Sequence, residues 1–87
     1  MDQIKIYRDK IDKIDNQIMQ LLEERFNIVL EIKTYKQQQN IAIFDPSREQ
    51  QILNKCQNYK FNNEITNIYK HILNESKNVQ MGLKWKV

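Results

Sequence analysis

The chain has 87 residues, 40% of them hydrophobic and 29% charged, and it contains one glycine and one proline. This length allows one small domain, the composition is too apolar for a disordered segment, and the lack of turn-forming residues disfavours a β-rich fold. The net charge of +3 is mild and the lysines are dispersed, which argues against a nucleic-acid-binding protein.

The first predicted element is one long amphipathic helix over about residues 3–38. Residues 1–45 contain neither glycine nor proline, and apolar side chains recur at the spacing of a heptad. Asn40 follows the last turn and is a suitable residue for a left-handed helix end. The apolar seam consists of Ile4, Tyr7, Ile11, Ile14, Ile18, Leu21, Ile28, Ile32 and Tyr35.

An apolar connector and a second helix follow. We expect the connector, residues 41–44, to cover part of the core. Asp45 and Pro46 then predict a helix start, because aspartate is a good N-cap and proline fits the first helical position. This helix is predicted over about residues 46–59. Its buried side chains are predicted to be Ile52, Leu53 and Cys56.

The third predicted helix covers about residues 63–80, after a turn at residues 60–63 that offers an asparagine as N-cap. The tail, residues 81–87, receives no predicted role. The fold class is therefore all-α, with three helices in a single domain over residues 1–87. One stripe of the third helix carries Ile65, Ile68, Tyr69, Ile72, Leu73, Ser76, Val79 and Gln80.

The length of the first helix predicts a second chain. Thirty-six helical residues span about 54 Å, whereas a compact monomer of this size is about 30–35 Å across. The apolar seam continues into the overhanging part through Ile4, Tyr7 and Ile11. A second copy of the chain would cover this part, so we expect a homodimer.

Several polar residues occupy positions where the helical pattern calls for apolar ones. Arg25 lies in the middle of the seam of the first helix, with Arg8 and Lys36 at its edge. Ser76 and Gln80 lie on the apolar stripe of the third helix. Each has an ordinary explanation when taken alone: a register-setting or snorkelling arginine, solvated edge charges, a small filler, a frayed helix end. Because buried charge is costly unless it is paired, the set together predicts a pocket.

The first turn of the second helix adds Arg48 and Glu49, which taken alone could be surface charges. Arg8 and Arg25 are about 25 Å apart along one helix, so they cannot hold one small ligand. If two first helices pair antiparallel and cross near residues 16–17, Arg8 of the partner subunit lies beside Arg25. Two equivalent basic pockets then form between the chains, suited to a small polyanion and a reaction without a covalent nucleophile.

Other function classes find little support in the sequence. The longest purely apolar run, Ile41 to Phe44, is too short for a membrane span, and residues 1–5 lack the apolar region of a signal peptide. We therefore expect a cytoplasmic protein. The single cysteine, Cys56, cannot form an intrachain disulfide or by itself a zinc site. The only histidine, His71, falls on the polar side of its helix and is expected to be exposed.

Five segments, at residues 7–15, 21–25, 32–36, 45–49 and 75–80, resemble the AroQ-class chorismate mutases, in order and without awkward gaps. The resemblance covers about residues 4–80. It implies an intertwined, all-helical homodimer that converts chorismate to prephenate in phenylalanine and tyrosine biosynthesis. This [3,3] rearrangement needs no cofactor, no metal and no covalent intermediate. With no fused domain in the sequence, a stand-alone form is expected.

The resemblance also implies roles for individual residues. Arg8 from the partner chain and Arg25 would hold the carboxylates of the substrate, and Ser76 would contact a carboxylate. Lys36 would contact a carboxylate and the ether oxygen, with Gln80 as the second donor to that oxygen.

The resemblance implies roles for three further positions near the start of the second helix. Glu49 and the backbone near Asp45 would engage the ring hydroxyl, and Arg48 would support the charge network of the pocket. Alternatives remain open at this point: an isochorismate-pyruvate lyase with the same fold, a catalytically silent regulator of another shikimate-pathway enzyme, and a small helical nucleic-acid-binding or coiled-coil module. Glu49 and Ser76 favour the mutase over the lyase.

Overall fold

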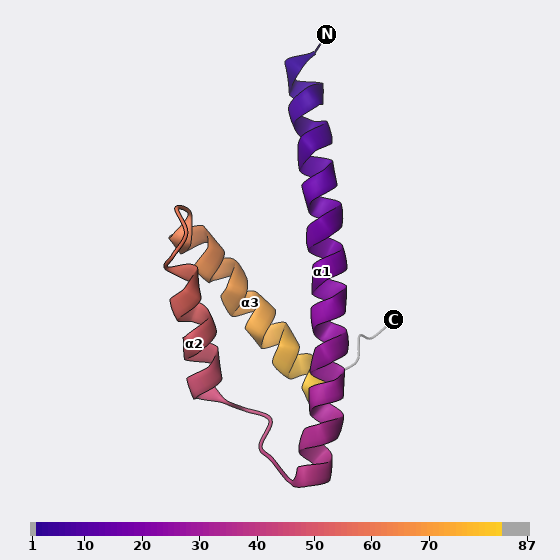
Figure 1. Ribbon diagram of the computed structural model, residues 1–87, viewed down its shortest axis with the longest axis vertical. Coiled ribbons are helices and arrows are strands. Elements are labelled where there is room, and N and C mark those ends of the chain that lie inside the picture. Colours follow the sequence, from indigo (N-terminus) through magenta and orange to yellow (C-terminus); the bar gives the residue numbers. More distant parts are fainter. Residues whose placement is uncertain (1, 83–87) are drawn as a thin grey trace.

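The computed structural model describes residues 2–82, which form three helices and, within that range, no strand. They are α1 (Gln3–Gln39), α2 (Pro46–Cys56) and α3 (Asn62–Gln80). Figure 1 shows α1 as a rod along the longest dimension of the molecule, with α2 and α3 on one side of its C-terminal half. The predicted all-α fold is confirmed.

Polar residues at both ends explain where α1 begins and stops. The carboxylate of Asp2 accepts a hydrogen bond from the backbone N–H of Ile4 at 3.0 Å and caps the N-terminus. At the other end Asn40 adopts a left-handed conformation with φ of 55°, and its N–H donates to the carbonyl of Lys36. The predicted left-handed asparagine is therefore present.

The start of α2 follows the sequence signal. Asp45 is the N-cap residue, and its carboxylate accepts a hydrogen bond from the backbone N–H of Arg48 at 3.1 Å. Pro46 occupies the first helical position, where its missing N–H removes no helical hydrogen bond. The cap fixes the first turn of α2, and with it the residues that follow Pro46.

One predicted boundary is wrong. The second helix ends at Cys56 instead of Tyr59, because the backbone N–H groups of residues 57–59 each bond to a carbonyl three residues back, which tightens the helix into turns. The third helix starts at Asn62, within one residue of the predicted start. Its N-cap is Phe61, which provides no side-chain hydrogen bond, so the predicted asparagine cap is absent.

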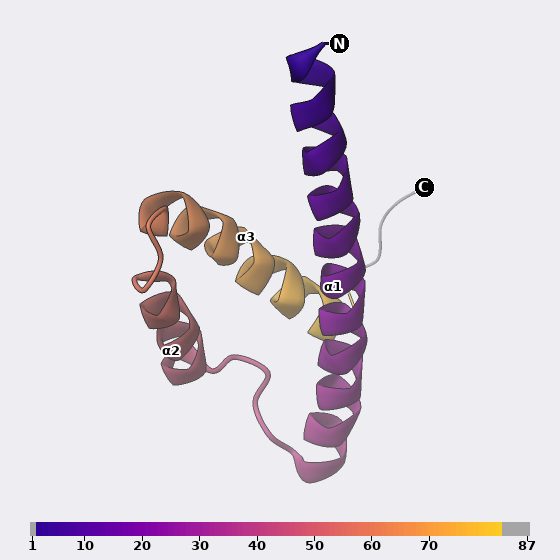
Figure 2. The ribbon, with the colours of Figure 1, turned by 45° about the horizontal axis from the view of Figure 1, so that its top comes forward.

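Helix α3 is the central packing element. It contacts both α1 and α2, whereas α1 and α2 do not pack against each other in the described part of the chain. Their ribbons remain well separated in both Figure 1 and Figure 2. The buried residues among those described are few and come from all three helices: Val29, Cys56, Leu73 and Ser76.

Some residues predicted to be buried are exposed in the single chain. In the connector only Ile43 is partly buried, whereas Ile41 and Phe44 are exposed, so the expectation that this segment covers the core holds for Ile43 alone. On α3, Ile68 is exposed because it faces an apolar groove between α3 and α1 that no other part of the described chain fills. Residues 83–87 of the predicted tail lie outside the described residues.

The molecule is much more extended than its length requires. Its radius of gyration is 16.4 Å and its longest extent 59 Å, whereas a compact chain of this length has a radius of about 12 Å. Its accessible surface of 7701 Å² compares with about 5,500 Å² for a compact monomer of its mass. The N-terminal half of α1 projects beyond α2 and α3 in both views (Figure 1, Figure 2).

The projecting part of α1 carries its apolar seam into solvent. Ile4, Tyr7, Ile11 and Ile14 are each more than half exposed. An apolar stripe of this length is unusual on the surface of a monomer. No helix in the described range combines the length and the apolar character that crossing a membrane requires.

Candidate active site

A cavity of 260 Å³ lies where the C-terminal half of α1, the connector, the first turns of α2 and the C-terminal half of α3 meet. Its apolar walls include Val29 from α1, Ile52 from α2 and Leu73 from α3. Seven of the eight site residues predicted from sequence line it: Arg25, Lys36, Asp45, Arg48, Glu49, Ser76 and Gln80.

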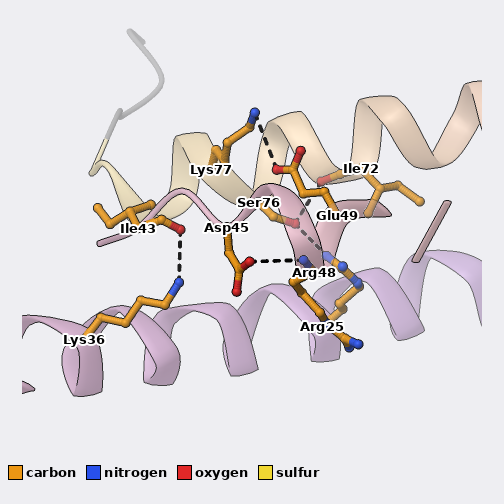
Figure 3. A network of polar contacts seen from close by, with 9 residues as sticks. All are labelled: Arg25, Lys36, Ile43, Asp45, Arg48, Glu49, Ile72, Ser76 and Lys77. Atoms are coloured by element: carbon orange, nitrogen blue, oxygen red, sulfur yellow. Dashed lines mark hydrogen bonds and ion pairs between the residues drawn. The ribbon is translucent and has the colours of Figure 1, made fainter. Parts of the chain in front are cut away.

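Arg25 reaches the cavity from the middle of α1. Its Nη1 donates to the Oγ of Ser76 at 2.5 Å, and that hydroxyl in turn donates to the carbonyl of Ile72 at 2.8 Å (Figure 3). The guanidinium is therefore held by a neutral hydroxyl, and within the described residues it has no carboxylate within 4 Å. Its positive charge remains available to an anionic ligand.

Lys36 lies eleven residues after Arg25, which is about three helical turns and places both on one face of α1. Its Nζ donates to the carbonyl of Ile43 at 3.0 Å, which ties the connector to α1 (Figure 3). An ammonium has three donors, so this bond leaves two of them for a ligand.

The first turn of α2 contributes three charged residues. Asp45 is engaged as the N-cap, and Arg48 extends its guanidinium to the Oε1 of Gln51, which accepts from Nη1 at 3.4 Å. Glu49 is partly buried next to the positive end of the helix dipole, which stabilises a carboxylate. The Asp45 cap therefore sets the position of both Arg48 and Glu49.

Sequence reasoning missed Lys77. It lines the cavity from α3, its Nζ lies 3.5 Å from Oε2 of Glu49, and the same Nζ lies 4.7 Å from the ring centroid of Phe44. The signal was its spacing: Lys77 follows the buried Leu73 by four residues and precedes Gln80 by three, which places all three on one side of α3. The apolar stripe predicted for the third helix includes Ser76 and Gln80 but not Lys77.

Gln80 lines the cavity from the last residue of α3. Its Oε1 is buried and has no hydrogen-bond partner among the described residues. Buried polar atoms nearly always form a hydrogen bond, so we expect this atom to bond to a ligand or to another chain. A half-turn of the amide exchanges its oxygen and nitrogen, which allows the group to present a donor instead.

Arg8 is the one predicted site residue that does not line the cavity. It is exposed on the projecting half of α1, seventeen residues from Arg25, or about 25 Å along the helix. A role for Arg8 in the site of a second chain stays a prediction. His71 is exposed, as expected.

The cavity is electrostatically positive. Four cationic side chains and two carboxylates line it, which gives a formal charge of +2 before any partner residue is added. Residues 2–82 contain no cluster of three or more histidine, cysteine, aspartate or glutamate side chains able to hold a metal ion. The arrangement suits a small polyanion that is bound by charge-assisted hydrogen bonds against apolar walls. The cations are Arg25, Lys36, Arg48 and Lys77, and the carboxylates are Asp45 and Glu49.

Comparison with protein families and curated proteins gives consistent matches. The family model described as chorismate mutase type II matches residues 7–81. A bifunctional chorismate mutase/prephenate dehydratase of Buchnera aphidicola is 39% identical over 83 residues, covering 90% of this chain and 22% of that protein. A chorismate mutase of Methanocaldococcus jannaschii is 42% identical over 48 residues, covering 55% of this chain and 48% of that protein. The chain thus spans less than half the length of these relatives.

Two solved structures are similar over nearly the whole chain. A conserved hypothetical protein from Pyrococcus furiosus superposes with a TM-score of 0.81 at 38% identity, covering 92% of this chain and 97% of that one. A chorismate mutase from Thermus thermophilus superposes with a TM-score of 0.80 at 25% identity, covering 86% of this chain and 99% of that one. The single long helix with two shorter ones on its side is therefore an established arrangement.

Proposed function

The chain belongs to the type II chorismate mutase family, and from this premise we propose that it converts chorismate to prephenate in a cavity completed by a second copy of the chain. One observation carries the proposal. Seven of the residues to which the sequence resemblance assigns a role, spread from position 25 to position 80, line one cavity at the junction of three helices. The reaction class is an intramolecular rearrangement, which makes the chain an isomerase.

The first task of the site is to hold a flexible dianion in a reactive, chair-like conformation. Arg25 and Arg8 of the partner subunit bind the two carboxylates, and Ser76 holds Arg25 in place. Fixing both ends of the substrate brings the carbon atoms that will be joined close together, which removes much of the entropic cost of the reaction. The apolar walls of the cavity exclude water around the ring.

The second task is to stabilise charge in the transition state. In the rearrangement the ether C–O bond breaks as a new C–C bond forms, and negative charge grows on the ether oxygen. The ammonium of Lys36 and the amide of Gln80 donate to this oxygen. Because the charge is larger in the transition state than in the bound substrate, these two donors lower the barrier and do not merely bind.

The remaining polar groups recognise the ring and complete the charge of the site. The carboxylate of Glu49 and the backbone near Asp45 accept a hydrogen bond from the ring hydroxyl and orient it. Arg48 adds positive charge that offsets the negative charge of the substrate. Asp45 sets these positions through its cap on α2, where it accepts from the backbone N–H of Arg48 at 3.1 Å.

The dimer is supported by what the single chain leaves uncovered. Its accessible surface of 7701 Å² exceeds that of a compact monomer by about 2,200 Å². One protomer of an obligate dimer buries a similar area in the interface. The exposed part includes the apolar seam of α1. Antiparallel pairing of two α1 helices about residues 16–17 covers the seam and brings Arg8 of the partner subunit to Arg25.

A direct assay tests the proposal. Purified protein is mixed with chorismate or with isochorismate, and the loss of substrate absorbance is followed while the products are identified. Chorismate loss that yields prephenate without pyruvate is expected, and Lys36→Ala is expected to abolish it without unfolding the protein. Lys13→Ala, on the outer side of α1, is the matched control and should retain full activity.

Other outcomes would contradict the proposal. Turnover of isochorismate alone, with pyruvate released, would identify a lyase on the same fold. A folded dimer that turns over neither substrate would identify a regulatory or binding protein.

A further inference from the structure

Lys77 is placed in the cavity, but the proposed reaction assigns it no role. It lies on the side of α3 that faces the cavity, between the buried Ser76 and the partly buried Gln80, and only 32% of its side chain is exposed. A lysine in such a position loses hydration and side-chain freedom, so its ammonium needs partners.

The two partners of Lys77 come from two other segments. Its Nζ lies 3.5 Å from Oε2 of Glu49 in the first turn of α2, and 4.7 Å from the ring centroid of Phe44 in the connector. Figure 3 shows the ammonium directed to the Glu49 carboxylate across the gap between α3 and α2. The side chain therefore links α3, α2 and the connector at one edge of the cavity.

This link affects the carboxylate that contacts the ring hydroxyl. Glu49 stands in a cavity suited to a dianion, and an uncompensated carboxylate there would repel the substrate. Lys77 offsets that charge and engages one carboxylate oxygen, which leaves the other oxygen to accept a hydrogen bond. The face of Phe44 gives the ammonium a second partner at this edge of the cavity, 4.7 Å from the ring centroid.

We propose that Lys77 is a positioning residue that holds the carboxylate of Glu49 in the orientation that receives the ring hydroxyl, and so sets the affinity for hydroxylated substrate. This inference rests on the proposed function. It predicts that Lys77 acts through Glu49 and not directly on the substrate.

A double-mutant cycle tests this dependence. The variants are Lys77→Met, which keeps the apolar stem and removes the charge, Glu49→Gln, and the two combined. Lys77→Met is expected to lower kcat/KM for chorismate about tenfold, mainly by raising KM, because the hydroxyl contact already exists in the bound substrate. In the Glu49→Gln background the same change is expected to cost less than about twofold.

Two further variants complete the experiment. Lys77→Arg is expected to restore activity to within about twofold, because a guanidinium pairs with a carboxylate and stacks on an aromatic ring. Lys70→Met is the matched control, since Lys70 is exposed two turns earlier on α3 and does not line the cavity. Helical circular dichroism and melting temperature are measured for every variant, with Lys77→Gln as a second neutral variant if the methionine variant does not fold.

The outcomes distinguish a failure of the proposed role of Lys77 from a failure of the proposed function. An active unmodified protein with unchanged kinetics in Lys77→Met would overturn the role of Lys77 alone. A tenfold loss that persists in the Glu49→Gln background would show direct action on the substrate and would also overturn it. Absence of chorismate turnover in the unmodified protein would overturn the proposed function, and the role of Lys77 with it.

Discussion

Arg25 lowers the stability of the fold but provides a positive charge for binding an anion. Its guanidinium occupies a seam position of α1 where an apolar side chain would pack, and among the described residues it is held by the Ser76 hydroxyl and not by a carboxylate. A charge kept in such a position without an ion pair is costly to stability and valuable for binding an anion.

Arg25→Leu should therefore separate stability from function. We expect turnover to be lost, because a carboxylate of the substrate loses its clamp. The melting temperature should stay the same or rise, because Ser76 keeps its hydrogen bond to Ile72 and the leucine continues the seam. Thermal unfolding and the chorismate assay on the same sample check both. An Arg25→Leu variant with full activity would show that this residue does not bind substrate.

A site residue can be predicted from the sequence when it breaks an apolar pattern. Arg25, Ser76 and Gln80 do so, and they line the cavity. Lys77 was missed because it lies at the edge of the stripe that carries Leu73 and Gln80, and a lysine at such an edge is usually solvated. Its importance comes from contacts with Glu49 and Phe44, which the packing of α3 against α2 creates.

The N-cap of α2 positions the first turn of that helix and the residues it contributes to the site. Asp45→Ala removes the carboxylate that accepts the backbone N–H of Arg48, and loss of such a cap costs about 1 kcal/mol. In a domain of this size that lowers the melting temperature by roughly 4–8 °C. Asp45→Asn is the matched control, because asparagine caps nearly as well. Equal melting temperatures for the alanine and asparagine variants would contradict the capping role.

Two helix ends were predictable because a residue with a strong conformational preference marks each of them. Asn40 and the Asp45–Pro46 pair mark the end of α1 and the start of α2, because their own conformational preferences fix the backbone. The end of α2 at Cys56 has no such residue. There the chain tightens through bonds to carbonyls three residues back, a geometry to which glutamine, asparagine and tyrosine give no distinct signal.

The length of the first helix predicted the extended shape of the whole molecule. A helix of 37 residues cannot fit within a compact chain of 87, and the observed extent of 59 Å follows directly. The heptad pattern likewise predicted which face of α1 lacks cover in one chain. The contacts inside the cavity could not be read from length or pattern, since they depend on how α2 and α3 are placed.

A charge placed in the projecting seam should disrupt assembly. Ile11 is 54% exposed in the single chain and would be covered in a dimer. Ile11→Glu is expected to reduce the mass measured by sedimentation equilibrium from twice the 10.6 kDa chain toward a monomer, with loss of helical signal because few residues are buried within one chain. Lys13→Glu, on the outer side of α1, should leave the dimer intact. An unmodified protein that sediments as a compact monomer would contradict the shared site.

Complementation between two inactive variants tests whether each active site takes Arg8 from one chain and Lys36 from the other. Arg8→Ala and Lys36→Ala are each expected to be inactive as homodimers. When equal amounts are unfolded and refolded together, half of the dimers are mixed, and each mixed dimer contains one intact site. Chorismate turnover should then return to about one quarter of the unmodified level. A refolded mixture that forms mixed dimers yet remains inactive would show that Arg8 and Lys36 do not act across the two chains.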